Sequence, residues 1–181
     1  KPLEGPVKIS GAKNSAGPLL AACLLTREEC TISNLPLVED IFNLITILKS
    51  MGVEVEWTNE HTVKVKAGDE TDPSRMDLSL IGKSRVSVLL IGAMAARFEK
   101  FNFTPPGGHR IGLRPITTHL EALGRMGLRV EKKEGRYLFD ASNLHSEKVI
   151  LKEFSVTATE VLIMAAAGTE GKTEIKTAAA E

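Results

Sequence analysis

The sequence has no net charge, few cysteines and no long hydrophobic run. Its 23 Lys and Arg residues balance 23 Asp and Glu residues, so overall charge favours neither a nucleic acid nor an anionic membrane as partner, and any anion site must be local. Cys23 and Cys30 form no CxxC or Cys/His metal-ligand pattern, which indicates a reducing, cytoplasmic setting and no bound metal. Without about 18 consecutive apolar residues or a signal-peptide pattern, neither membrane insertion nor secretion is expected.

The length of the chain limits its domain organisation. At 181 residues, 43% of them hydrophobic, it is long enough for one compact domain with its own core, or at most two small ones. It begins without Met and stops at 178–181, immediately after a segment, TEIKT, that is typical of a strand. We therefore expect residues 1–181 to form a single domain that is a fragment of a longer polypeptide.

The segment PPGGHRIGLRP, residues 105–115, has the features of a ligand-binding loop. Its glycines carry no Cβ and let the backbone approach a ligand, and His109 is a titratable group. Arg114 and Pro115 stand where a helix is expected to begin, since Pro is favoured at the first helical position. The free N–H groups there would bind an anion, with Arg114 as its partner. The alternative is a plain strand-to-helix connection, because Gly and Pro punctuate most loops.

A second candidate site lies in the segment ISGAKNS near the start of the chain. A short strand is expected over 7–10 and an apolar helix over 16–25, capped by Asn14 or Ser15. Lys13 would then lie beside a helix N-terminus, where a bound anion is stabilised. The alternative is a lysine that is only solvated.

The rest of the chain alternates between helical and extended patterns. Apolar residues at helical spacing predict helices over 38–50, 85–96, 115–126 and 158–167. Alternating residues predict strands over 31–34, 53–57, 62–66, 101–103, 128–131, 136–139, 148–151 and 173–176.

This order of elements repeats. The segments LLAACLLTREECTISNLP, LLIGAMAARFEKFNFTPP and LIMAAAGTEGKTEIKTAA follow one another at nearly equal intervals, and ILKSMGVEVE corresponds to ALGRMGLRVE. Such units stack into a shared core, and two full copies and part of a third are present. Because one helix of each copy is nearly apolar all round and the strands are amphipathic, we predict an α/β fold with helices inside and sheets outside.

These repeats, together with ISGAKNS and PPGGHRIGLRP, resemble the enolpyruvyl transferases over essentially the whole chain. The branch of that family that uses a UDP-sugar fits better than the shikimate-phosphate branch, which begins with a GSK-type motif and lacks the Gly-Gly loop. The resemblance implies an inside-out α/β barrel of repeated βαβαββ units, as one domain of a two-domain enzyme. The C-terminal half, which would supply an aspartate base, is missing, so the isolated chain is expected to be inactive.

The resemblance also implies an activity. The enolpyruvyl group of phosphoenolpyruvate would pass to the 3-hydroxyl of UDP-N-acetylglucosamine with release of phosphate. This reaction is the first committed step of peptidoglycan synthesis, and it serves cell-wall biogenesis, cell shape and cell division. No metal or organic cofactor is implied. Two alternatives stay open, a related transferase with another hydroxyl acceptor and a catalytically silent UDP-sugar-binding module.

The resemblance assigns the substrates to four segments. Lys13 and Asn14 would contact phosphoenolpyruvate and the sugar, and Arg85 would hold anionic substrate. The helix that begins near Arg114 would meet the UDP portion and the enolpyruvate carboxylate, and a later loop would contact UDP. The residues implied in these last two contacts are Arg114, Pro115, Ile116, Thr117, Thr118, Ser155 and Val156.

Three positions depart from the family's pattern. His109 stands where the family has a loop cysteine, sometimes an aspartate, that protonates C3 of the enol. A histidine, with an ordinary pKa of about 6.5, is suited to that general-acid role, although His109 could instead be a spectator in a degenerate site. Thr117 replaces an aspartate near the uracil and Glu153 a lysine near the nucleotide, and a lost direct cation contact is expected to weaken binding by about 1–3 kcal/mol. His119 either faces the nucleotide or is an ordinary surface histidine.

Overall fold

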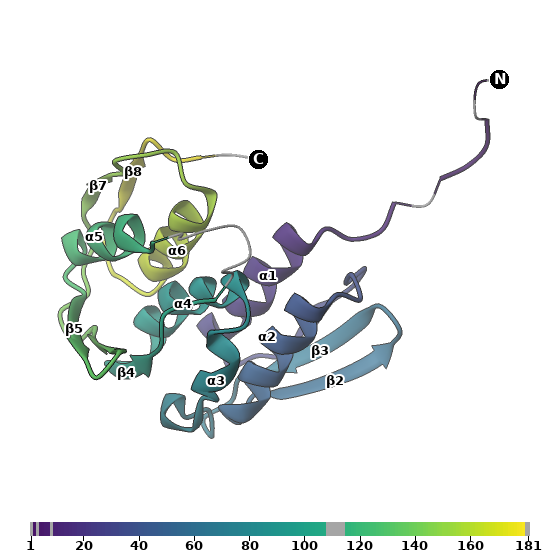
Figure 1. The fold of residues 1–181 in the computed structure, drawn as a ribbon, viewed down its shortest axis with the longest axis horizontal. Coiled ribbons are helices and arrows are strands. Elements are labelled where there is room, and N and C mark those ends of the chain that lie inside the picture. Colours follow the sequence, from purple (N-terminus) through teal and green to yellow (C-terminus); the bar gives the residue numbers. More distant parts are fainter. Residues whose placement is uncertain (1, 3, 8, 108–114, 180–181) are drawn as a thin grey trace.

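The computed structural model describes residues 2, 4–7, 9–107 and 115–179. Three helical segments lie at the centre of the molecule: α1 (Lys13–Ala22), α4 (Leu90–Arg97) and α6 (Val156–Ala167) (Figure 1). The 3₁₀ segment η1 (Cys23–Leu25) extends α1, and the 3₁₀ segment η3 (Arg85–Leu89) directly precedes α4. In α4, every residue from Leu90 to Ala95 is buried.

The central helices pack at short distance. A Cβ on Gly92 of α4 would lie 2.2 Å from the carbonyl oxygen of Val161 in α6, and one on Gly17 of α1 would lie 2.7 Å from a methyl carbon of Val86. Glycine at these two positions lets the backbones approach closely, so the helix core depends on residue size as well as on apolarity.

Two similar antiparallel sheets cover the core. The first contains β1 (Cys30–Ile32), β2 (Glu54–Asn59) and β3 (Thr62–Lys66) in the order β1-β3-β2. The second contains β4 (Lys100–Phe103), β5 (Arg129–Lys133) and β6 (Arg136–Asp140) in the order β4-β6-β5. A parallel pair, β7 (Lys148–Ile150) and β8 (Glu174–Lys176), flanks α6 in sequence. Helices inside and sheets outside confirm the predicted fold class.

Helix α2 (Glu39–Ser50) follows β1, and helix α5 (Thr117–Arg125) precedes β5. The residues predicted to form the buried face are all buried: Ile41, Leu44, Ile45 and Leu48 in α2 and Met51 directly after it. Ile47, which the pattern did not include, is buried as well. Two short helices, η2 (Pro73–Arg75) and α3 (Leu78–Ile81), lie in a segment where the sequence predicted only a polar connection. Asp72 and Asp77 cap them, each accepting a hydrogen bond from a serine N–H two residues later.

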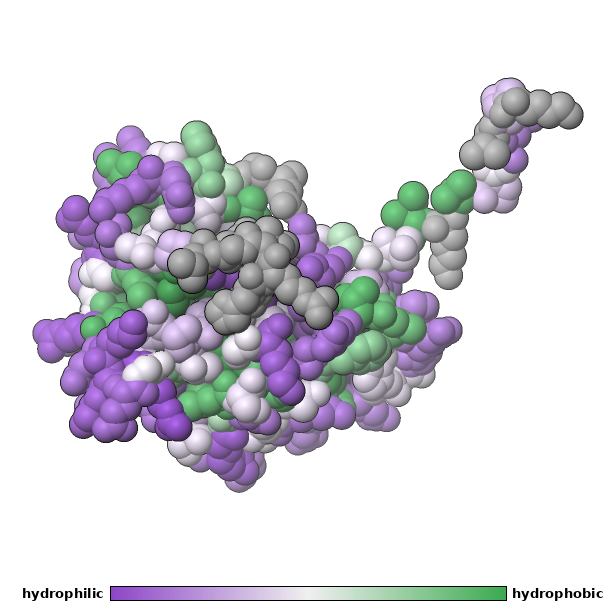
Figure 2. All heavy atoms as spheres, viewed as in Figure 1, coloured by the Kyte–Doolittle hydropathy of each residue, from purple (hydrophilic) through white to green (hydrophobic). Residues whose placement is uncertain are grey.

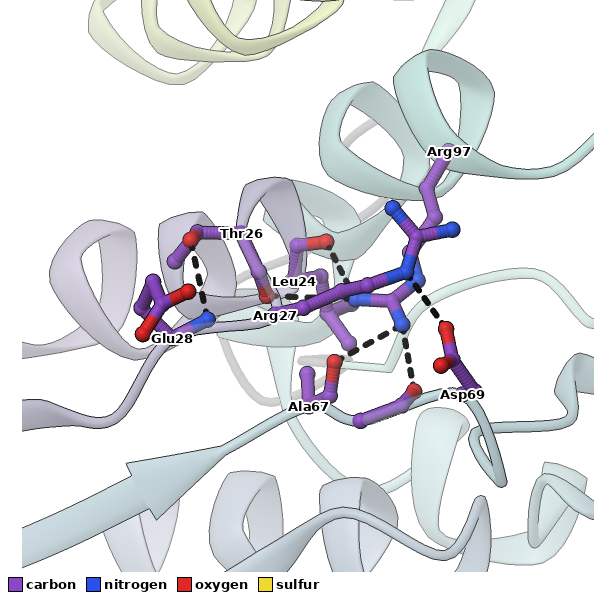
Figure 3. Close-up of polar contacts among 8 residues, drawn as sticks. Leu24, Thr26, Arg27, Glu28, Ala67, Asp69 and Arg97 are labelled. Atoms are coloured by element: carbon purple, nitrogen blue, oxygen red, sulfur yellow. Dashed lines mark hydrogen bonds and ion pairs between the residues drawn. The ribbon is translucent and has the colours of Figure 1, made fainter.

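Arg97, at the end of α4, ties separate segments together through main-chain carbonyls (Figure 3). Its guanidinium donates to the carbonyl oxygens of Leu24 at 2.9 Å and Thr26 at 3.3 Å, and to those of Ala67 at 2.7 Å and Gly68 at 2.6 Å. One side chain therefore joins the end of η1 to the segment that follows β3, across the first repeat.

The expected strand over 7–10 is wrong for its described residues, none of which lies in a strand. This N-terminal segment projects away from the rest of the chain and carries apolar surface (Figures 1 and 2). Val7 is 82% exposed and Ile9 78% exposed. An alternating pattern forms a strand only where another backbone is available to pair, and no described segment pairs with this one.

Two predicted helix starts are also wrong. Helix α1 begins at Lys13 with Ala12 as its N-cap, so neither Asn14 nor Ser15 is the cap. Helix α5 begins at Thr117 with Ile116 as its N-cap, so Pro115 does not occupy the first helical position. In both places the main chain at the helix entry lies against a residue far away in sequence: a Cβ on Gly11 would lie 1.7 Å from the Asn34 carbonyl oxygen, and the carbonyl of Pro115 accepts a hydrogen bond from the guanidinium of Arg85.

Candidate functional site

Lys13 is held at the first residue of α1 by a contact with the start of α2. Its Nζ lies 2.7 Å from Oδ2 of Asp40, which is in the first turn of α2. Ser84, the N-cap of η3, donates its hydroxyl to the other carboxylate oxygen of Asp40 at 2.5 Å. The starts of three helical segments thus meet at one carboxylate, and Lys13 is more than a solvated surface lysine.

The carboxyl group of Asp40 is ionised in this arrangement. Burial raises its pKa, but hydrogen bonds from Lys13 and Ser84 and the charge of Lys13 outweigh burial, so the pKa lies below the ordinary value. The ammonium group of Lys13 is therefore charge-paired, and the Lys13 side chain as a whole is still 45% exposed. An incoming anion could bind Lys13 if it competes with Asp40 for the ammonium group. Asn14, the next residue of α1, is exposed beside it.

Arg85 connects this cluster to the entry of α5. Arg85 follows Ser84 in sequence, and its Nη2 donates to the carbonyl oxygen of Pro115 at 3.1 Å. The base of the Gly-rich loop lies nearby, because the N–H of Gly107 donates to the Ile81 carbonyl at 3.1 Å. A Cβ at position 107 would lie 1.8 Å from the Gly82 carbonyl oxygen, so glycine is required there. His109 and Arg114 lie outside the described residues.

The predicted nucleotide contacts come together at the starts of α5 and α6. Thr117 is exposed, and Thr118 donates its hydroxyl to Oε1 of Glu153 at 2.6 Å. Ser155 caps α6 by accepting the N–H of Ala158 at 3.3 Å, and Val156 is the first helical residue. Ile116 is an exception among the predicted contacts, since its side chain is buried in the core.

His119 is buried, so the alternative of a surface histidine is wrong. Its side chain is 3% exposed, and its Nε2 lies 2.8 Å from the hydroxyl of Thr157 in α6. Burial, and next the charge of Arg85, lower the pKa of His119 to about 4, while Glu153 acts in the opposite direction. The imidazole is therefore neutral at physiological pH.

Together these residues form a surface suited to anions. Free N–H groups at the starts of helices and the cations Lys13 and Arg85 favour a phosphate or carboxylate. Among the described residues, no group of three or more His, Cys, Asp or Glu side chains is placed to hold a metal ion. Within the same ranges, no helix combines the length and apolarity needed to cross a bilayer.

Sequence reasoning missed Asp40 and Ser84. Asp40 had a signal, since an acidic residue in the first turn of a helix is favoured by the helix dipole, but that signal names no partner. Its contacts with Lys13 and Ser84 span 27 and 44 residues of sequence, and nothing local indicates them.

Solved structures with the same fold are enolpyruvyl transferases. The enolpyruvyl transferase NikO from Streptomyces tendae matches 96% of this chain and 40% of its own, with a TM-score of 0.79 at 21% sequence identity. EPSP synthase from Acinetobacter baumannii matches 94% of this chain and 40% of its own, with a TM-score of 0.72 at 16% identity. The fold is therefore that of the enolpyruvyl transferases.

The sequence model of the EPSP synthase (3-phosphoshikimate 1-carboxyvinyltransferase) family matches residues 1–181, and the chain belongs to this family. Similar curated proteins are named UDP-N-acetylglucosamine 1-carboxyvinyltransferase. The protein from Campylobacter hominis is 40% identical over 179 residues, and that from Helicobacter acinonychis is 40% identical over 181 residues. Each match covers 99% of this chain but only 42% and 43% of the relative's own length. The resemblance inferred from the sequence motifs is confirmed.

Proposed function

We propose that the protein transfers the enolpyruvyl group of phosphoenolpyruvate to the 3-hydroxyl of UDP-N-acetylglucosamine with release of phosphate. One observation carries this proposal. Lys13, at the start of α1, pairs with Asp40 at the start of α2, and Arg85 donates to Pro115 at the entry of α5. Two anionic substrates need several fixed cations and helix N-termini in one place, and this cluster has both. Relatives 40% identical along the chain carry the name of this reaction.

The proposed binding roles follow the geometry. Lys13 exchanges Asp40 for an anionic group of the substrate, with Asn14 contacting phosphoenolpyruvate and the sugar beside it. Arg85 holds anionic substrate while its bond to Pro115 keeps it next to α5. Arg114 completes the anion site, and the remaining contacts with UDP come from Pro115, Thr117, Thr118, Ser155 and Val156. Ile116, whose side chain is buried, contributes only through its main chain.

The proposed chemistry is an addition followed by an elimination. The sugar oxygen bonds to C2 of the enol as a proton is added at C3. The C2–O bond to phosphate then breaks as a proton leaves C3, which restores the C2=C3 double bond of the enolpyruvyl group. His109 supplies the proton to C3. A base from a further part of the protein takes the proton of the sugar hydroxyl. No electrons are transferred in either step, so the reaction needs no redox partner.

We also propose that residues 1–181 form one domain, made of two full repeats and part of a third. The curated relatives are more than twice as long as this chain, which supports a second domain that completes the site. We place the protein in the cytoplasm, where both substrates would be made.

The proposal is tested by phosphate release from the full-length protein with both substrates, comparing wild type with His109→Ala across pH. We expect release to collapse in His109→Ala. In wild type, we expect activity to fall as pH rises through the ordinary range of histidine, about 6.5, because the general acid must be protonated. His145→Ala, which changes an exposed histidine outside the cluster, is the matched control and should keep wild-type activity.

Other results would point elsewhere. Release only with a different hydroxyl acceptor would indicate a related transferase. Nucleotide binding without release, unaffected by phosphoenolpyruvate and by His109→Ala, would indicate a silent binding module. Full activity of His109→Ala would remove the proton-donor role while leaving the transferase proposal in place.

A further inference from the structure

His119 bridges the two helices whose starts carry the proposed UDP contacts. It is the third residue of α5, and its Nε2 lies 2.8 Å from the hydroxyl of Thr157, the second residue of α6. With 3% of its surface exposed, the imidazole is shielded from water. Because water does not compete for this hydrogen bond, the bond can hold the first turns of α5 and α6 at a fixed separation.

A second bridge between the same regions is weaker. Thr118 donates to Glu153 at 2.6 Å, but Glu153 is exposed and water competes for its carboxylate. The buried bond of His119 is therefore the stronger constraint on how α5 and α6 approach each other.

The second ring nitrogen of His119 points to a role beyond packing. Nδ1 is buried and has no hydrogen-bond partner among the described residues. An unpaired buried polar atom is costly, and an apolar side chain would fill the same space without that cost. The charged groups that act on the ring are Arg85 and Glu153, whose effects oppose each other, and burial keeps the ring neutral. His119 therefore acts through hydrogen bonds and not through charge.

We propose that His119 is a positioning residue for nucleotide recognition. Its bond to Thr157 sets the separation between the first turns of α5 and α6, so that Thr117 and Thr118 on one side and Ser155 and Val156 on the other meet a single UDP group. This inference rests on the proposed function, and it adds a residue that does not itself contact the substrate.

The test compares two substitutions of Thr157 in the full-length protein. Thr157→Val keeps the shape of the side chain but removes the hydroxyl, whereas Thr157→Ser keeps the hydroxyl. We expect Thr157→Val to raise the KM for UDP-N-acetylglucosamine about three- to tenfold with kcat little changed, since one neutral hydrogen bond is lost. Thr157→Ser should retain a KM near the wild-type value. Thr46→Val, which removes an exposed hydroxyl bonded within α2, is the matched control.

A double-mutant cycle with His119→Gln shows whether His119 and Thr157 affect KM through their shared hydrogen bond or independently of each other. If the hydrogen bond between His119 and Thr157 is what lowers KM, the double variant His119→Gln, Thr157→Val has a KM no higher than that of the more damaging single variant. Additive effects, or equal KM values for Thr157→Val and Thr157→Ser, would overturn the inference and leave the proposed function intact. Wild-type protein that neither binds nor turns over UDP-N-acetylglucosamine would instead remove the proposed function, and the inference with it.

Discussion

At the scale of single residues, partnership between distant positions decides what a charged side chain can do. Lys13 could be read from the sequence as a cation at a helix start. Its pairing with Asp40 could not, because that contact depends on how the first repeat folds back on itself. The same holds for His119, whose burial against Thr157 is set by the packing of α5 on α6. Motifs therefore suggest candidate positions but not the residues that hold them.

The pair formed by Lys13 and Asp40 should contribute modestly to stability. Asp40→Asn is expected to lower the free energy of unfolding by about 1 kcal/mol at neutral pH, because the pair is partly exposed. Since the pKa of Asp40 is lowered in the folded chain, the difference from wild type should be full above the ordinary pKa and vanish as pH falls through the lowered one. Urea denaturation at several pH values measures this difference.

A second aspartate provides the control for that substitution. Asp69 pairs with Arg27 at 2.5 Å, but the two side chains are 83% and 71% exposed. Asp69→Asn should therefore leave stability nearly unchanged at every pH. Equal losses for Asp40→Asn and Asp69→Asn would show that the cluster at the helix starts gives Asp40 no special role.

At the scale of elements, periodic patterns predict the helices and strands well but predict their ends poorly. The helix over 38–50 and the strands over 53–57, 62–66, 128–131 and 136–139 appear within a few residues of their predicted bounds. Strong apolar periodicity specifies such elements locally. The starts of α1 and α5 were misplaced, because contacts of Gly11 with Asn34 and of Pro115 with Arg85 fix the backbone there. The segment 7–10 had a strand pattern but has no strand partner among the described residues.

Close packing of α4 on α6 predicts a size limit at Gly92. Gly92→Ala would place a Cβ 2.2 Å from the carbonyl oxygen of Val161, so the helices must separate. We expect a loss of about 1–3 kcal/mol in the free energy of unfolding, as for other overpacked cores. Gly124→Ala in α5 is the control, because no described residue outside its own stretch of helix has an atom within 4 Å of its Cβ position. That change should stabilise the chain by about 0.5–1 kcal/mol through helix propensity. Urea denaturation of both variants checks the contrast, and similar effects of the two would refute close helix contact.

At the scale of the whole molecule, the inside-out arrangement could be predicted because one helix in each repeat is apolar on nearly every side. Such helices can be accommodated only in the interior, and α4 and α6 are found there. The sequence could not show which polar groups the core would enclose. Enclosing His119 links the stability of the whole fold to pH.

The fold should lose stability on acidification through His119. Its pKa falls from an ordinary 6.5 to about 4 in the folded chain, so between these values the unfolded chain binds a proton that the folded chain does not. The neutral ring's contribution is complete above pH 6.5 and decreases as pH falls towards 4, by up to about 3 kcal/mol. Urea denaturation of wild type and His119→Gln between pH 7.5 and 4 measures it. Wild type should lose more stability over this range than His119→Gln, whereas the exposed control His145→Gln should follow wild type. Parallel curves for wild type and His119→Gln would mean that the ring takes up its proton as readily in the folded chain as in the unfolded one, and that His119 does not stay neutral in the core.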